Sequence, residues 1–243
     1  MIDHPISSVH FLFNQAEING DKSAFSYKDN QIWNDISWNT YRGDVHKAAG
    51  SLISIGCNSG DKVCILGFNN YNWVTMDMAA MMTGAIPAGI YETCSAEEIS
   101  YILNHSEAKV LLIEDTEQWQ KINEIRNDLK FLEKVILMEG CDEITDDLVI
   151  DWKSFMNLSN EDNRKAAFVS MGKLQKDDVA TFIYTSGTTG PPKAVMLSNE
   201  NMTWTAKQAI DLISLSPDDT SLSYLPLSHI AEQMFTLHAP AIS

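Results

Sequence analysis

The feature that most restricts the fold of this chain is an alternation of short apolar runs with segments of helical periodicity. Apolar residues fill the runs 63–68, 110–113 and 135–138. A strand that is apolar on both faces needs helices on both sides of its sheet. Because strand and helix alternate, the strands are expected to be parallel and joined by right-handed crossovers. We therefore predict an α/β fold with an open, doubly wound, mostly parallel sheet and flanking helices.

Polar residues and glycines mark where several elements should begin and end. Asn69 or Asn70 can cap a helix that ends at Gly84. Residues 95–98 have the capping-box pattern, in which a serine and a glutamate satisfy each other's backbone N–H groups. Two short strands are expected on either side of a turn at 28–30.

Other segments carry weaker patterns. The apolar spacing favours a helix that reaches Leu129, and the acidic residues of 139–151 favour an exposed connection. A helix after Ser198 is expected to turn Trp204 and Ile210 toward the core.

Acidic residues outnumber basic residues by 33 to 17, which gives a formal net charge of −16. A basic face for nucleic acid is therefore not expected. Any bound polyphosphate would have to be held locally, against the negative field of the whole molecule. A magnesium ion would help to hold it.

The cysteine spacing and the N-terminal residues indicate in which cellular compartment the protein is expected. The four cysteines show no CxxC or Cys/His spacing, so they favour neither zinc nor a disulfide framework. The N-terminus lacks the basic region of a signal peptide, and the longest apolar stretch, 78–90, is too short to span a bilayer. These features predict a cytoplasmic protein, with peripheral membrane contact left open.

Residues 182–198 read as a strand, a loop and a second strand, and the loop has the composition of an anion site. Its glycines can turn backbone N–H groups inward, its hydroxyls can donate, and its lysine adds a positive charge. The candidate phosphate-binding residues are Thr185, Ser186, Gly187, Thr188, Thr189, Gly190 and Lys193. Pro191 and Pro192 stiffen the exit of the loop.

Two other interpretations of this loop fit less well. In the P-loop the two glycines are five positions apart and the lysine follows the second directly, whereas here two prolines intervene. An ordinary hairpin turn needs a glycine or asparagine pair and has no use for four hydroxyls and a lysine.

The loop resembles the Thr-Ser-Gly-Thr-Thr-Gly-x-Pro-Lys-Gly motif of the adenylate-forming enzymes, which include acyl-CoA synthetases, luciferases and peptide-synthetase adenylation domains. The match is nearly contiguous, but Ala194 stands where that family usually has glycine. Alanine is tolerated at a negative φ and strained at a positive one. We therefore predict a negative φ at Ala194.

Residues 223–234 form a second informative stretch. Pro226 ends an extended segment, and Ser228 is expected to cap a helix that begins near His229. Taken alone, such a histidine is more often structural than functional. Its place some forty residues after the loop resembles the next motif of acyl-CoA synthetases, in which the matching position borders the acyl pocket. His229 is therefore a candidate catalytic residue.

Several stretches together resemble the long-chain, bubblegum-type acyl-CoA synthetases. They are 65–69, Trp73, 89–91 and 224–230, and the likeness runs from about Phe11 to Met234. The resemblance implies that a fatty acid carboxylate attacks the α-phosphorus of ATP, and that the thiol of coenzyme A then displaces AMP. It also implies that the loop holds the β- and γ-phosphates and that Thr185 contacts Mg²⁺.

The resemblance covers well under half of such an enzyme. The motifs that close the adenine, ribose and magnesium sites, the hinge and the small C-terminal domain do not occur before Ser243. The chain is expected to be the N-terminal part, 1–243, of an AMP-binding (adenylation) domain that forms the family's large domain, with the C-terminal remainder absent. Acyl chain length and oligomeric state are not predicted.

Two alternatives remain open at this point. One is a short, non-catalytic protein of the same fold that binds a nucleotide, an acyl group or a partner. The other is an adenylating enzyme for a different acid, such as an aryl or amino acid. The first differs in chain length, and the second differs in the acid that supports adenylate formation.

We expect the isolated 243-residue chain to be poorly stable and inactive, because a parallel sheet needs both faces and its ligand crevice covered. Purified chain should therefore show no palmitate-dependent exchange between ATP and pyrophosphate. Robust exchange by that chain would contradict this expectation.

Overall fold

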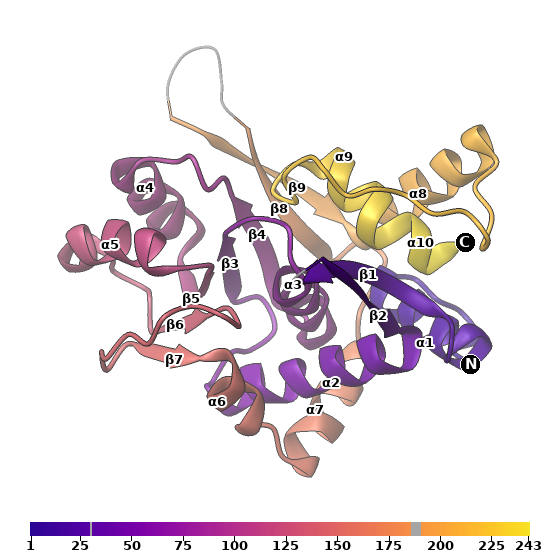
Figure 1. Ribbon diagram of the computed structural model, residues 1–243, viewed down its shortest axis with the longest axis horizontal. Coiled ribbons are helices and arrows are strands. Elements are labelled where there is room, and N and C mark those ends of the chain that lie inside the picture. The colour runs from indigo at the N-terminus through magenta and orange to yellow at the C-terminus, as the bar shows by residue number, and fades with distance from the viewer. Residues whose placement is uncertain (30, 186–190) are drawn as a thin grey trace.

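A seven-stranded sheet with the order β7-β6-β5-β3-β4-β8-β9 crosses the molecule (Figure 1). The computed structural model describes residues 1–29, 31–185 and 191–243. The strands are β3 (Lys62–Leu66), β4 (Ile86–Ile90), β5 (Ala108–Ile113), β6 (Lys134–Leu137), β7 (Val149–Asp151), β8 (Val179–Thr185) and β9 (Lys193–Ser198). Neighbouring strands are parallel except for the antiparallel pair β8 and β9. The predicted mostly parallel α/β sheet is confirmed.

Helices cover both faces of this sheet (Figure 1). One face carries α1 (Ser8–Asn19), α2 (Trp38–Ser54), α3 (Tyr71–Thr83), α6 (Trp152–Asn157), α7 (Glu161–Met171) and α8 (Asn199–Ile213). The other face carries α4 (Ala96–Ser106) and α5 (Thr116–Glu124). Strand β3 supplies alternate residues to both cores, with Val63 and Ile65 on the first face and Cys64 and Leu66 on the second. Its apolar run is explained by this burial on two sides.

The two ends of the chain pack against each other on the first face. A small antiparallel sheet of β1 (Ser23–Asp29) and β2 (Ile32–Ser37) follows α1, and Asn30 of the predicted turn lies outside the described residues. The chain finishes with α9 (Ile230–Gln233), a π-helical turn over Met234–His238 and α10 (Ala239–Ile242). The Ser8 hydroxyl lies 2.8 Å from Nδ1 of the buried His238.

The predicted helix ends of the central region are confirmed. Asn70 caps α3, because its side-chain oxygen accepts the backbone N–H of Trp73 at 2.9 Å. Gly84 ends α3 in the left-handed conformation, with φ of 78°. Ser95 and Glu98 form the expected reciprocal capping box of α4. These caps satisfy backbone groups that would otherwise be left unpaired.

One of the two weaker expectations for the region between β5 and β7 is wrong and the other is confirmed. Helix α5 ends at Glu124 and does not reach Leu129, because the chain tightens into a 3-10 turn at Arg126–Asp128. The side chain of Asn104 bonds the backbone of Asp128 and Lys130 and holds the end of this turn against α4. The expectation of a surface connection over the acidic segment 139–151 is confirmed, and this connection ends in the edge strand β7.

Trp204 also departs from expectation. Its side chain is 61% exposed, whereas Ile210 does pack against the core. Met202 and Ala206 supply the fully buried positions of α8, so the buried stripe of the helix is narrower than the apolar pattern suggested. Within the described ranges, no helix combines the length and apolar content needed to span a bilayer.

Two glycine substitutions should change stability in opposite directions. In Gly84→Ala the new methyl group would lie 2.7 Å from the Ser59 hydroxyl at a left-handed φ, so we expect a loss of about 1–2 kcal/mol. Gly43 lies exposed within α2 with no atom near its missing Cβ, so Gly43→Ala should stabilise by about 0.5–1 kcal/mol. Urea denaturation measures both, and a shift of the same sign would contradict the assignment.

Candidate functional site

The hairpin of β8 and β9 extends beyond β4, the other neighbour of β8 in the sheet. Strand β4 pairs with β8 only at Ala88 with Phe182 and at Gly89 with Ile183, whereas β8 stays paired with β9 as far as Thr185 with Lys193. Figure 1 shows the hairpin projecting past the rest of the sheet. Both Thr185 and Lys193 are exposed at its outer end. The sequence loop that they flank is therefore carried on a projecting stem.

Side-chain alternation divides this stem between two faces. Gly89 faces Trp73 and Ser228, and its partner Ile183 shares that face. Thr185 follows two residues later, and its cross-strand partner Lys193 points the same way. Tyr184 points to the opposite face, where it joins the core beneath α4. The hydroxyl and the ammonium group expected to hold phosphate are thus presented together.

Two of the seven predicted phosphate-binding residues lie within the described part of the chain. They are Thr185 and Lys193, while Ser186, Gly187, Thr188, Thr189 and Gly190 lie outside the described residues. Ala194 sits within β9 and packs against the α4-side core. Among the described residues, positive φ at non-glycine positions occurs at Gln31, Glu107 and Ser214, so the predicted negative φ at Ala194 is confirmed.

The stretch 223–229, here called the crossing segment, is tied down by the side chain of Asn69. The Asn69 amide donates to the Leu225 carbonyl at 2.7 Å and to the Ser223 hydroxyl at 2.8 Å, and its oxygen accepts the Leu227 N–H at 2.8 Å. Asn69 lies shortly after β3, which ends at Leu66. This one side chain therefore fixes the crossing segment over the carboxyl end of the sheet.

Two side chains at the end of α9 also bond the crossing segment, and Gly89 lets it pack close to β4. The Glu232 carboxylate accepts the Leu225 N–H at 3.1 Å, and the Gln233 amide donates to the Leu227 carbonyl at 2.8 Å. A Cβ on Gly89 would lie 2.7 Å from the Ser228 Cα. The crossing segment is thus packed directly on β4, beside the strand that ends in Thr185.

The sequence did not reveal these positioning roles. The sequence pattern predicts Asn69 or Asn70 as a helix cap; the cap is Asn70, and the Asn69 amide bonds the crossing segment instead. A pair of adjacent asparagines after a buried strand is the pattern that could have indicated a second role. Nothing local in the sequence marks Glu232 or Gln233, because their partners lie in a turn without regular structure.

His229 is placed at the end of the crossing segment, exposed to solvent. The prediction that Ser228 caps the helix is wrong. His229 itself is the N-cap of α9, and its Nδ1 accepts the Ala231 N–H at 3.2 Å. Ser228 is buried, with its backbone against Gly89.

The crevice between the ends of β3 and β5 is acidic. The chain leaves these two neighbouring strands toward opposite faces, which is where ligands of open α/β sheets commonly bind. Burial raises the pKa of Glu114 in this crevice, and the nearby charges of Asp115 and Glu92 raise it further. Burial also raises the pKa of the Cys141 thiol, and Asp115 and Asp142 add to the effect. Such surroundings oppose a polyphosphate.

A cavity of about 400 Å³ is lined in part by Tyr224 and Leu225 of the crossing segment. It is bounded by the α1–β1 region, the segment after α8, and α9 with the turn that follows it. Its apolar lining includes Trp38, Leu215, Leu222, Leu225 and Phe235. No cluster of three or more His, Cys, Asp or Glu side chains able to hold a metal occurs within the described ranges.

Removing the Asn69 amide should release the crossing segment. In Asn69→Ala the Leu227 N–H loses its acceptor, so its hydrogen exchange should become faster and the protein should lose about 1–3 kcal/mol of stability. Asn69→Asp keeps the acceptor and loses the two donated bonds, which makes it the matched control. Unchanged exchange at Leu227 in Asn69→Ala would contradict the assigned role.

Comparison with known proteins extends this description. The family model of AMP-binding enzymes matches residues 12–243. The long-chain-fatty-acid–CoA ligase ACSBG2 of Xenopus laevis is 36% identical over 243 residues, which is 96% of this chain and 32% of that protein. The human ligase ACSBG1 is 34% identical over 235 residues, which is 95% of this chain and 32% of that protein. The chain spans about a third of the length of these curated relatives.

Solved structures agree with the fold. The anthranilate CoA ligase AuaEII, in complex with anthranoyl-AMP, superposes with a TM-score of 0.86 at 20% identity and covers 99% of this chain and 44% of that one. The fatty acyl-adenylate ligase of L. pneumophila gives 0.77 at 18% identity, covering 98% of this chain and 38% of that one. With nearly the whole sequence matched by the family model, the chain belongs to the AMP-binding enzyme family.

Proposed function

We propose that this chain is the phosphate-holding part of an ATP-dependent long-chain fatty acid–CoA ligase. The observation that carries the proposal is the cross-strand pair of Thr185 and Lys193 at the end of a projecting hairpin, on the face of the crossing segment. Relatives at 34–36% identity over 95–97% of this chain carry the name long-chain-fatty-acid–CoA ligase, which supports the choice of acid.

The proposed chemistry has two steps. An ionised fatty acid carboxylate attacks the α-phosphorus of ATP, which forms an acyl-adenylate and releases pyrophosphate. The thiol of coenzyme A then attacks the acyl carbon, which forms the thioester and releases AMP. No general base is needed in the first step, because a carboxylate is already ionised at neutral pH. The main work of the protein is to position the groups and to neutralise phosphate charge.

Within this scheme, Lys193 and the hydroxyls and backbone of Thr185, Ser186, Gly187, Thr188, Thr189 and Gly190 hold the β- and γ-phosphates. Mg²⁺ fits this donor set, because it is commonly held by a few protein oxygens together with substrate phosphates and water. Thr185 offers an exposed hydroxyl for it. When bound, the ion neutralises phosphate charge.

The acyl group is proposed to lie near the crossing segment. His229 is exposed at the end of this segment, where its Nδ1 caps α9, and its exposed ring is placed to border the reacting carboxylate. The cavity of about 400 Å³ beside the segment has a lining that mixes polar with apolar side chains and a size typical of ligand pockets, and its apolar part suits an alkyl chain.

The sequence is proposed to be part, residues 1–243, of a longer AMP-binding domain. Groups for adenine, ribose and coenzyme A would then come from residues outside this sequence. We propose a cytoplasmic location with peripheral membrane contact, since the substrate partitions into bilayers. The intact mass of the protein in its source cells tests the length: a mass well above 27.2 kDa is expected, and a mass of 27.2 kDa would favour a short, non-catalytic nucleotide- or acyl-binding protein.

Replacing Lys193 tests the phosphate site. In the protein at its native length, Lys193→Ala should raise the KM for ATP in palmitate-dependent ATP–pyrophosphate exchange by about 10-fold or more, because a charged hydrogen bond is lost. Lys193→Arg should retain part of the affinity. Lys176→Ala is the matched control, since Lys176 pairs with Glu200 on the surface.

Two results would count against this proposal. An equal effect of Lys176→Ala would remove the special role of Lys193. Exchange that depends on an aryl or amino acid and not on palmitate would favour the alternative of another adenylating enzyme with the same fold.

A further inference from the structure

The outer end of the β8–β9 hairpin receives little support from the sheet. Pairing with β4 stops at Ile183, so Tyr184 and Thr185 have a strand neighbour only on the β9 side. A two-stranded ribbon is marginally stable by itself and twists freely. The sheet pairing sets the face that Thr185 and Lys193 share, but this outer end needs a further contact to hold it in place relative to the rest of the molecule.

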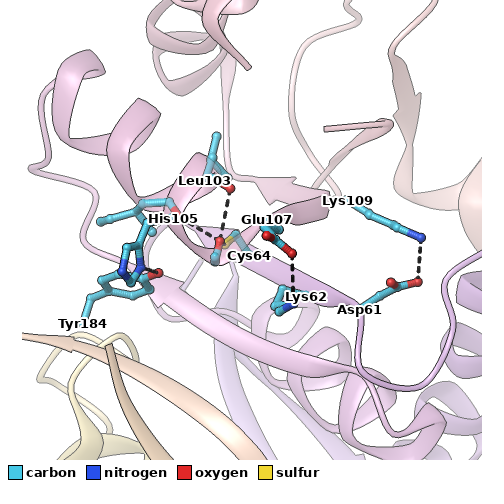
Figure 2. A network of polar contacts seen from close by, with 10 residues as sticks. Asp61, Lys62, Cys64, Leu103, His105, Glu107, Lys109 and Tyr184 are labelled. Carbon is cyan, nitrogen blue, oxygen red and sulfur yellow. Dashed lines mark hydrogen bonds and ion pairs between the residues drawn. The ribbon is translucent and has the colours of Figure 1, made fainter. Parts of the chain in front are cut away.

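Tyr184 supplies a contact at this position (Figure 2). Its side chain is only 5% exposed, and its hydroxyl lies 3.0 Å from Nδ1 of His105 in the last turn of α4. Burial raises the pKa of this hydroxyl, so it stays protonated and donates when the imidazole carries its proton on Nε2. The two rings also meet edge to face with centroids 5.8 Å apart.

His105 is itself held in place. Its ring stacks on Tyr101, one turn earlier in α4, with centroids 5.3 Å apart and an angle of 23° between the planes. The next residue, Ser106, donates to the carbonyls of Ile102 and Leu103 and lies 3.7 Å from the Cys64 sulfur of β3. The end of α4 is thereby fixed to the central strand.

Ion pairs fasten the chain on either side of this point. Glu107, the left-handed C-cap of α4, lies 3.7 Å from the Lys62 ammonium, and Lys109 of β5 lies 3.1 Å from Asp61 (Figure 2). These partners belong to β3 and its approach. His105 therefore projects from a helix end that is tied to β3, whereas Tyr184 and Thr185 have a strand neighbour on the β9 side only.

From this arrangement we propose that His105 is a positioning residue, which holds the Tyr184 hydroxyl and so fixes the orientation of Thr185 and Lys193. It acts from the face opposite to the one that presents these two residues. Where it concerns ATP, this inference rests on the proposed function. The Tyr184–His105 bond links the hairpin beyond Ile183 to the helical layer.

The first test follows the hairpin without any ligand. Tyr184→Phe keeps the buried ring and removes only the hydroxyl, so the protein should fold normally. Hydrogen exchange at the amides of 181–185 and 193–197 should become about fivefold faster, as expected for the loss of one net hydrogen bond. Tyr27→Phe, at an exposed tyrosine of β1, is the matched control and should change nothing.

The second test separates positioning from general stability. In the protein at its native length, Tyr184→Phe and His105→Ala should each raise the KM for ATP by about fivefold while kcat changes less than twofold. The double variant should be no worse than either single one. His105→Asn, whose side-chain oxygen can take the place of Nδ1, should restore the KM to within twofold.

The outcomes keep this inference apart from the proposed function. Unchanged exchange in Tyr184→Phe, additive effects in the double variant, or no rescue by His105→Asn would overturn the positioning role. If the wild-type protein shows no ATP-dependent activity, the proposed function fails, and the hydrogen-exchange comparison alone decides whether His105 holds the hairpin.

Discussion

The two-residue period of β8 is the constraint on which the candidate site depends. Successive side chains at the end of this strand must point to opposite faces, so one residue can be buried while the next is presented to a ligand. Tyr184 is held in the α4-side core, and Thr185 faces outward with Lys193 opposite. The anchoring residue, Tyr184, and the presented residue, Thr185, are therefore neighbours in one strand. A shift of one residue in register would exchange the faces to which they point.

Electrostatics explains why the hairpin, and not the crevice of the sheet, carries the expected phosphate residues. The chain has a net charge of −16, and acidic side chains around Glu114 and Asp115 line the crevice between β3 and β5. A triphosphate there would meet like charges in a partly buried place. At the hairpin the proposed site offers the exposed Lys193 instead. Asn69 and Gly89 then bring the crossing segment to the same edge without adding charge.

Local patterns were sufficient for most of the fold. The burial of β3 on two faces, the Asn70 cap, the Gly84 stop and the Ser95 capping box are all decided within a few residues, and all were predictable. The wrong predictions concern places where residues distant in the sequence determine the local structure. Asn104 holds the chain after α5, and the narrow buried stripe of α8 leaves Trp204 exposed. In the site, the loop composition predicted Thr185 and Lys193. It could not predict Asn69 or His105, whose partners are 79 or more residues away.

The most direct measurement is a structure of the protein at its native length with ATP and magnesium. The account predicts the β- and γ-phosphates within hydrogen-bond distance of the Lys193 ammonium and the Thr185 hydroxyl, on the face of the crossing segment, with Tyr184 still bonded to His105. A triphosphate bound in the crevice beside Gly67 and Glu114, with Lys193 free in solvent, would contradict it.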